Sequence, residues 1–169
     1  SPASPPRGFP HLYPARTIAW HSIALCGLLA LGTHLLRHSP DARPIAFWAT
    51  LLFAAHPLGV HSVTWISGRK DLLCTVFSVF ALLAFARLAL ADKQSAIGPV
   101  RVILWSLVSA VALAAALAAK ELAFVVPVFA TGWLLAELWY NRGSDHFRVP
   151  LWPAACGLVS LWALAGLAS

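Results

Sequence analysis

The chain is poor in charge and contains no methionine. Among its 169 residues 11% are charged and 60% are hydrophobic, and the mean hydropathy is +0.77. Soluble domains typically carry about 25% charged residues, so this composition excludes an ordinary soluble domain and predicts a membrane protein. Because methionine is absent even from the first position, we expect the sequence to be a piece of a longer polypeptide.

Cysteine is also scarce, and its spacing matches no CxxC pattern. Cys26, Cys74 and Cys156 each lie within an apolar stretch, so we expect small core residues rather than disulfides or a zinc site. The cations stand singly at the ends of apolar stretches, which excludes the clustered basic face of a nucleic-acid-binding protein. No cofactor is evident, and the sequence does not support a divalent metal.

Six apolar stretches predict an all-α fold, a polytopic transmembrane helical bundle of about five or six spans. Four of them approach the roughly 20 residues that a spanning helix needs. Residues 1–16 are rich in proline and contain no acid, so we expect an irregular extracytoplasmic segment there and a transmembrane domain over residues 17–169. The apolar stretches are 17–36, 45–55, 72–91, 100–119, 122–140 and 150–168.

Charge placement predicts the orientation. If the first span begins at residue 17, the loops alternate sides, and the side with more cations is expected to be cytoplasmic. We therefore expect an integral protein of the bacterial inner membrane. The side with fewer cations is then extracytoplasmic. The cytoplasmic set is Arg37, Arg43, Arg87, Lys93, Arg101, Arg142 and Arg148, and the other set is Arg7, Arg16, Arg69, Lys70 and Lys120.

Residues 56–71 form the most polar connection. Charge held beside lipid is costly, so such clusters usually line a cavity or a substrate site. Arginine and lysine suit phosphate recognition, whereas histidine and carboxylate suit general base chemistry. Pro57 should push His56 away from helical geometry, and residues 60–67 are apolar enough to predict a re-entrant or surface-lying segment. The polar side chains of this loop are His56, His61, Arg69, Lys70 and Asp71.

A second polar pair, Lys120 and Glu121, separates two later apolar stretches. The predicted topology places this pair on the same side of the membrane as the polar loop. Structural roles are open for each group: Asp71 suits the start of a helix, Lys120 could reach the head groups, and Lys120 and Glu121 could form an ion pair within the bundle.

The polar loop resembles a signature of polytopic O-mannosyltransferase-like proteins. The resemblance is carried by residues 53–58 (FAAHPL), 62–65 (SVTW) and 68–73 (GRKDLL). Residues 11–36 and the Lys120-Glu121 pair are similar to further segments of that family, so the resemblance covers most of residues 11–140. It implies a partial GT-C-like membrane domain, which in this family precedes tetratricopeptide repeats.

The resemblance further implies an activity: transfer of a sugar, often mannose, from a polyprenyl-phosphate carrier to a protein hydroxyl on the extracytoplasmic side. The partners would be the lipid bilayer, the lipid-linked sugar and a protein acceptor. The matching candidates for catalysis are His61, Asp71 and Glu121, and those for binding the substrate phosphate are His56, Arg69, Lys70 and Lys120.

Two positions depart from the family pattern. Gly59 and His61 stand where relatives usually carry His and Glu, and residues 1–16 lack the acid expected in the first extramembrane loop. Three alternatives follow: the base lies outside this sequence, His61 replaces the acid, or the protein is a non-catalytic structural or accessory subunit of a larger membrane complex.

Overall fold

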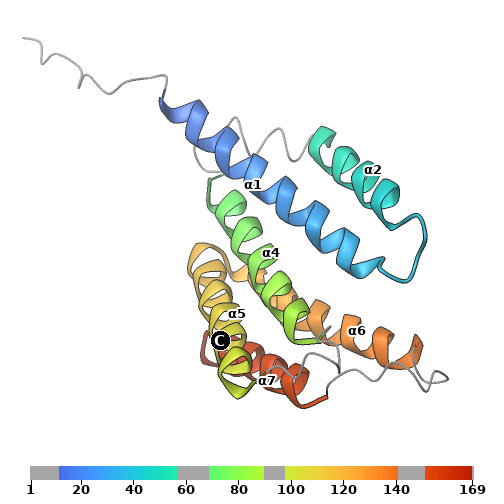
Figure 1. Cartoon of the computed structure of the whole chain (residues 1–169). Coiled ribbons are helices and arrows are strands. Elements are labelled where there is room, and N and C mark those ends of the chain that lie inside the picture. Colours follow the sequence, from blue (N-terminus) through green and yellow to red (C-terminus); the bar gives the residue numbers. More distant parts are fainter. Residues whose placement is uncertain (1–11, 57–68, 90–97, 141–150, 169) are drawn as a thin grey trace, which may run out of the picture.

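The computed structural model describes residues 12–56, 69–89, 98–140 and 151–168. Within these ranges the chain forms six α-helices, one short 3-10 helix and no strand (Figure 1). The all-α membrane bundle predicted from composition and hydropathy is therefore confirmed. The elements are α1 (Leu12–Leu35), α2 (Ala42–Ala55), α4 (Arg69–Ala89), α5 (Pro99–Ala119), η2 (Glu121–Phe124), α6 (Val125–Tyr140) and α7 (Leu151–Ala168).

Four helical segments of the described residues are long and apolar enough to cross a membrane: Ala15–Leu35, Lys70–Ala89, Pro99–Ala119 and Glu121–Trp139. The short second helix, α2, has 14 residues. At about 1.5 Å per residue it is roughly 21 Å long, less than the roughly 30 Å of a hydrocarbon core. The sequence also predicted this shorter stretch.

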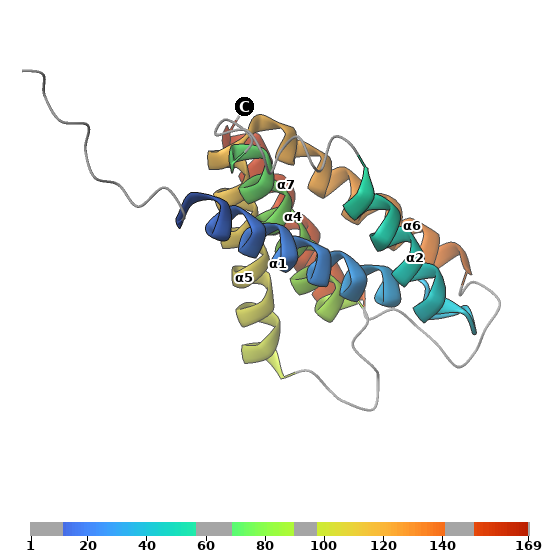
Figure 2. The ribbon, with the colours of Figure 1, turned by 90° about the horizontal axis from the view of Figure 1, so that it is seen from above.

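Helix α4 lies at the centre of the bundle and packs against α1, α5, α6 and α7 (Figures 1 and 2). Its spanning segment is 61% buried, compared with 11–39% in the other three. The core contains Phe85 of α4, Leu113 of α5 and Trp133 of α6. The rings of Phe85 and Trp133 meet edge to face with centroids 6.2 Å apart.

Small residues allow the helices to approach closely, as is usual in membrane bundles. A Cβ atom on Gly27 of α1 would lie 2.7 Å from Val79 Cγ1 of α4. A Cβ atom on Gly157 of α7 would lie 2.9 Å from Leu88 Cδ1, also of α4. Ser109 adds a buried hydrogen bond between α5 and α4, because its hydroxyl donates to the Ala81 carbonyl at 2.9 Å.

The helix boundaries test the sequence prediction at three places. Helix α1 begins at Leu12, so residues 12–16 are helical, although we expected an irregular segment over residues 1–16. Pro14 fits there because proline is tolerated in a first turn. His56 is extended, with φ −67° and ψ 133°, as Pro57 predicted. Residues 1–11 and the expected re-entrant segment lie outside the described residues.

The third place is the 3-10 helix that precedes α6. We expected a span to begin at residue 122, but residues Glu121–Phe124 form η2 and the α-helix starts at Val125. Pro127 explains the change, since it has no N–H and its ring would clash with the carbonyl of Ala123 in a continuous α-helix.

Candidate functional site

One charged residue from each of the two polar segments singled out in the sequence, Asp71 and Lys120, meet at one end of the bundle, which we call the site end. Asp71 lies in the first turn of α4. Lys120 is the single residue between α5 and η2, and its backbone is extended, with φ −162° and ψ 138°. Because α4 and α5 pack along each other, the start of α4 lies beside the end of α5.

Lys120 Nζ donates a hydrogen bond to the Asp71 carboxylate and forms an ion pair with it. The side chains remain 47% and 44% exposed, respectively. The hydrogen bond and the charge of Asp71 raise the pKa of Lys120 above its ordinary value of 10.5. A lysine ammonium carries three N–H donors, so Lys120 can hold Asp71 and still donate to an anionic ligand.

A small cavity of about 170 Å³ lies at the same end, between the N-terminal parts of α1 and α4. Its lining includes Arg16 and Trp20 from α1 and Leu72 from α4. Arg16 is exposed and forms no salt bridge with the described residues. From the sequence, Arg16 served only in the cation count that predicts the membrane orientation. Nothing in the sequence indicated that α1 and α4 begin side by side.

The remaining site residues predicted from sequence divide into three groups. Lys70 and Glu121 are exposed at the site end, and Glu121 forms no ion pair with the part of the chain that is described. His56 is the exposed residue that follows α2. Arg69 begins α4, and His61 lies outside the described residues.

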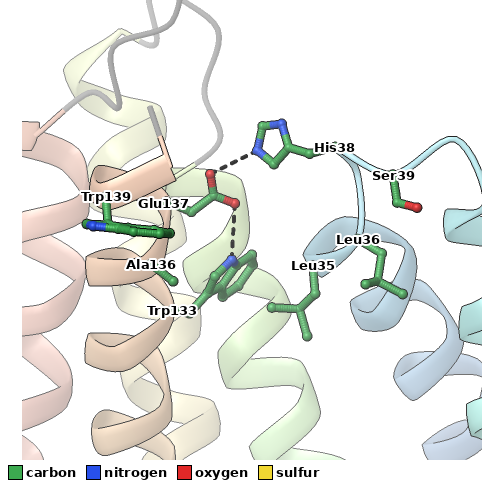
Figure 3. A pocket seen from close by; sticks show the side chains of 8 residues that line it. All are labelled: Leu35, Leu36, His38, Ser39, Trp133, Ala136, Glu137 and Trp139. Carbon is green, nitrogen blue, oxygen red and sulfur yellow. Dashed lines mark hydrogen bonds and ion pairs between the residues drawn. The ribbon is translucent and has the colours of Figure 1, made fainter. Parts of the chain in front are cut away.

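A second polar cluster lies at the other end of the bundle, which we call the opposite end (Figure 3). Glu137 of α6 is 5% exposed and accepts a hydrogen bond from Arg37 Nη2 at 2.8 Å. Trp133 Nε1, one helical turn earlier, donates to the other carboxylate oxygen at 3.3 Å. The sequence analysis missed this cluster. The available signal was that Glu137 is the one acid within residues 122–140, and an acid inside an apolar span usually has a specific partner.

His38 completes this second cluster and makes two contacts through one nitrogen. Its Nε2 lies 3.1 Å from Glu137 Oε2 and 3.1 Å from Arg37 Nε. A ring nitrogen either donates or accepts, so Nε2 donates to the carboxylate in one tautomer and accepts from the guanidinium in the other. The ion pair between Arg37 and Glu137 is present with either tautomer.

Within the described ranges, no three His, Cys, Asp or Glu side chains come together as metal ligands do. Cys74 is buried and Cys26 is exposed, and both are free thiols. Cys26 therefore differs from the small core residue that we expected, because it lies on the outer surface of α1. The Cys74 thiol is 4.0 Å from the Lys120 carbonyl oxygen, to which it donates a weak hydrogen bond.

Comparison with known proteins gives one partial match. A protein named protein O-mannosyl-transferase from Caenorhabditis elegans is 41% identical to this chain over 71 residues. The match covers 42% of this chain and 10% of that relative, so the chain spans about a tenth of the relative's length. No family model and no solved structure matches the chain.

This match supports the resemblance found from the motifs, because the relative is also named an O-mannosyl-transferase. It supports nothing finer than that name. The GT-C fold, the polyprenyl-phosphate carrier and the tetratricopeptide repeats stay predictions. The relative is an animal protein, so it lends no support to a location in the bacterial inner membrane. The four spanning segments identify an integral membrane protein.

Proposed function

We propose that this chain belongs to a membrane glycosyltransferase that transfers a sugar, mannose in our reading, from a polyprenyl-phosphate carrier to a protein hydroxyl on the extracytoplasmic side. The observation that carries the proposal is the ion pair between Lys120 and Asp71, which joins the two segments of the sequence that resemble the family. The similarity to a protein named O-mannosyl-transferase supports the same class of reaction.

The cations of the site end would bind the phosphate of the carrier. Lys120, Lys70 and Arg16 are exposed there, and Arg69 begins the adjacent helix. During transfer the bond between the anomeric carbon and the phosphate oxygen breaks, and negative charge accumulates on the departing phosphate. Fixed cations stabilise this charge more in the transition state than in the ground state. His56 would line the site beside them.

The acceptor hydroxyl must lose its proton as it attacks the anomeric carbon. Among the predicted carboxylates, Asp71 already accepts a hydrogen bond from Lys120 and forms an ion pair with it. Glu121 is exposed and forms no ion pair with the described residues, so it is better suited to act as the base. His61 is the other candidate for this step. Asp71 is then a positioning residue that orients Lys120 toward the phosphate.

The test is mannosylation of a Ser/Thr-containing acceptor by membranes that contain the full-length protein. Lys120→Ala and Arg69→Ala should each lower the rate about 10²- to 10³-fold, the loss typical of removing one charge-stabilising contact, while the protein level stays constant. Asp71→Asn should chiefly raise the KM for the lipid donor. Arg101→Gln is the control, because this exposed arginine lies in the first turn of α5, at the opposite end. Unchanged rates in both alanine variants would contradict the assignment.

A non-catalytic role in a larger membrane assembly is the second candidate. It is favoured by the fact that Lys120 already neutralises Asp71, an arrangement that also serves to join α4 and α5. This role predicts that the full-length protein copurifies with other membrane subunits in fixed stoichiometry. It further predicts that Asp71→Asn and Lys120→Ala loosen the assembly, and that Glu121→Gln leaves mannosylation unchanged.

A further inference from the structure

The cavity of about 170 Å³ at the site end has a chemistry that the proposed transfer reaction has not yet used. It is lined by Arg16, Thr17 and Trp20 of α1 and by Leu72 and Leu73 of α4. Leu72 and Thr17 are 5% and 6% exposed, whereas Trp20 is 39% exposed and Arg16 is also exposed. Thr17 and Leu72 therefore form the inner wall of the cavity, and Arg16 and Trp20 lie at its outer edge.

The cavity lies close to the surface of the membrane. Arg16 and Leu72 are the second and third residues of the spanning segments Ala15–Leu35 and Lys70–Ala89. Trp20 follows Arg16 by four residues, so the α1 wall extends about 6 Å along the helix axis. This is the depth at which the head group of a lipid meets the first carbons of its tail.

The lining suits hydrocarbon better than a sugar. Two leucines and the indole ring of Trp20 provide most of it, and Thr17 and Arg16 are its polar side chains. A sugar ring carries a hydroxyl on most of its carbons, and each hydroxyl buried without a hydrogen bond is costly. Two polar side chains cannot satisfy all of these hydroxyls, whereas a hydrocarbon group needs no polar partner.

The volume of the cavity limits the size of that hydrocarbon group. An apolar cavity of about 150 Å³ takes up benzene, a six-carbon hydrocarbon. A cavity of about 170 Å³ therefore matches one isoprene unit, which has five carbons including a methyl branch. An unbranched acyl chain would leave the space of this branch unfilled, and the wall atoms around it would lose their packing contacts.

Cations lie beside the outer edge of the cavity. Arg16 lines the cavity itself. On the other helix, Leu72 directly follows Asp71, whose carboxylate forms an ion pair with Lys120. The ion pair thus holds the Lys120 ammonium at the start of α4, next to the residues that form the α4 wall. A guanidinium and an ammonium at the depth of the head groups suit a lipid phosphate.

From this combination of apolar lining, small volume and adjacent cations, we propose that the cavity binds the first isoprene unit of the polyprenyl-phosphate carrier, the unit that is bonded to the phosphate. Arg16 contacts the phosphate, and Trp20 and Leu73 pack on the isoprene unit. This inference rests on the proposed function, because that function supplies the carrier. The cavity then selects an isoprenoid carrier over membrane phospholipids, which also carry a phosphate but have unbranched chains.

The experiment is native mass spectrometry of the purified full-length protein, titrated with farnesyl phosphate or with dodecyl phosphate. Both probes have the same phosphate and main chain, and only farnesyl phosphate has methyl branches. We expect it to bind about fourfold more tightly, the effect of burying the one methyl branch of its first unit. Leu73→Phe narrows the cavity and should remove this preference. Leu104→Phe is the matched control, because Leu104 is 53% exposed on α5, and it should retain the preference.

Two further variants guard against a misfolded protein. Trp20→Ala should also remove the preference, whereas Trp139→Ala, at a tryptophan that is 77% exposed at the opposite end, should keep it. Arg16→Gln should weaken both probes by the same factor, up to about fivefold. Because each variant is compared with the unsubstituted protein in the same detergent, the partition of the probes into the micelle cancels.

Equal affinities of the two probes for the unsubstituted protein, or binding of neither probe, would overturn the proposal. A preference that survives both Leu73→Phe and Trp20→Ala would do the same. Neither a sugar nor an acceptor is present in this experiment. A protein that shows the preference and fails to transfer mannose therefore contradicts the proposed function and leaves the assignment of the cavity intact.

Discussion

Lys120 and Asp71 are 49 positions apart in the sequence, and their side chains form an ion pair at the site end of the bundle. One residue terminates α5 and the other lies in the first turn of α4. The contact therefore fixes the relative register of the two most extensively packed helices. It also holds the Lys120 ammonium at the start of α4, the helix that begins with Arg69 and Lys70.

Exchanging the two charges separates the structural role of this pair from its role in the reaction. Asp71→Lys and Lys120→Asp should each lower the Tm of the detergent-solubilised protein, because each places like charges side by side. The double exchange should restore most of the Tm, measured by intrinsic tryptophan fluorescence. It should not restore mannosylation, since the cation then stands on α4. Full recovery of both properties would mean that the pair acts only in packing.

The same pair predicts that its contribution to the stability of the folded protein changes with pH only under alkaline conditions. The pKa of Lys120 is raised in the folded protein by the hydrogen bond and charge of Asp71. A raised lysine pKa contributes stability that is fully present below the ordinary value of 10.5 and is lost as the pH rises through the folded value. The Tm difference between the unsubstituted protein and Asp71→Asn should stay constant from about pH 7 to 9 and shrink near pH 11.

Close helix packing makes Gly27 a sensitive position. A Cβ atom there would lie 2.7 Å from Val79 Cγ1, and the β-branched valine has little freedom to move away. Gly27→Ala should therefore destabilise the protein by about 1–3 kcal/mol, measured by reversible denaturation in mixed micelles. Gly132→Ala is the control, because no atom lies within 4 Å of its added Cβ. It should be neutral or up to about 1 kcal/mol more stable.

The cluster at the opposite end should behave as a buried ion pair. Arg37→Met leaves the Glu137 carboxylate, which is 5% exposed, without its arginine partner. His38 and Trp133 still bond to it, so we expect a loss of about 2 kcal/mol, below the full cost of an isolated buried charge. The double variant Arg37→Met with Glu137→Gln should recover at least half of this loss. No recovery would show that Arg37 acts through packing rather than charge.

Local sequence patterns predicted most of the helices. Hydropathy alone located the four spanning segments, because a helix in lipid needs a continuous apolar stretch of fixed length. Pro57 predicted the extended backbone at His56, since the steric effect of proline acts on its neighbour. The start of α6 was placed three residues too early, because the effect of Pro127 on the preceding turn was not considered.

The candidate site could be predicted only in part. Alternating topology placed Asp71 and Lys120 on the same side of the membrane, which is a property of span order and needs no packing information. Arg16 and the pair formed by Arg37 and Glu137 were not assigned to any site. Their positions depend on which helices are neighbours, and a hydropathy pattern contains no information about neighbours.

The sequence by itself thus determined that this protein is a bundle of membrane helices, because burial of apolar residues in lipid is a property of each segment alone. Only the tertiary structure decided that Lys120 reaches Asp71, that Arg37 neutralises Glu137 across 100 positions, and that α1 and α4 leave a cavity between their N-terminal parts. These contacts follow from the fit of small and large side chains between helices. That fit depends on residues far apart in the chain.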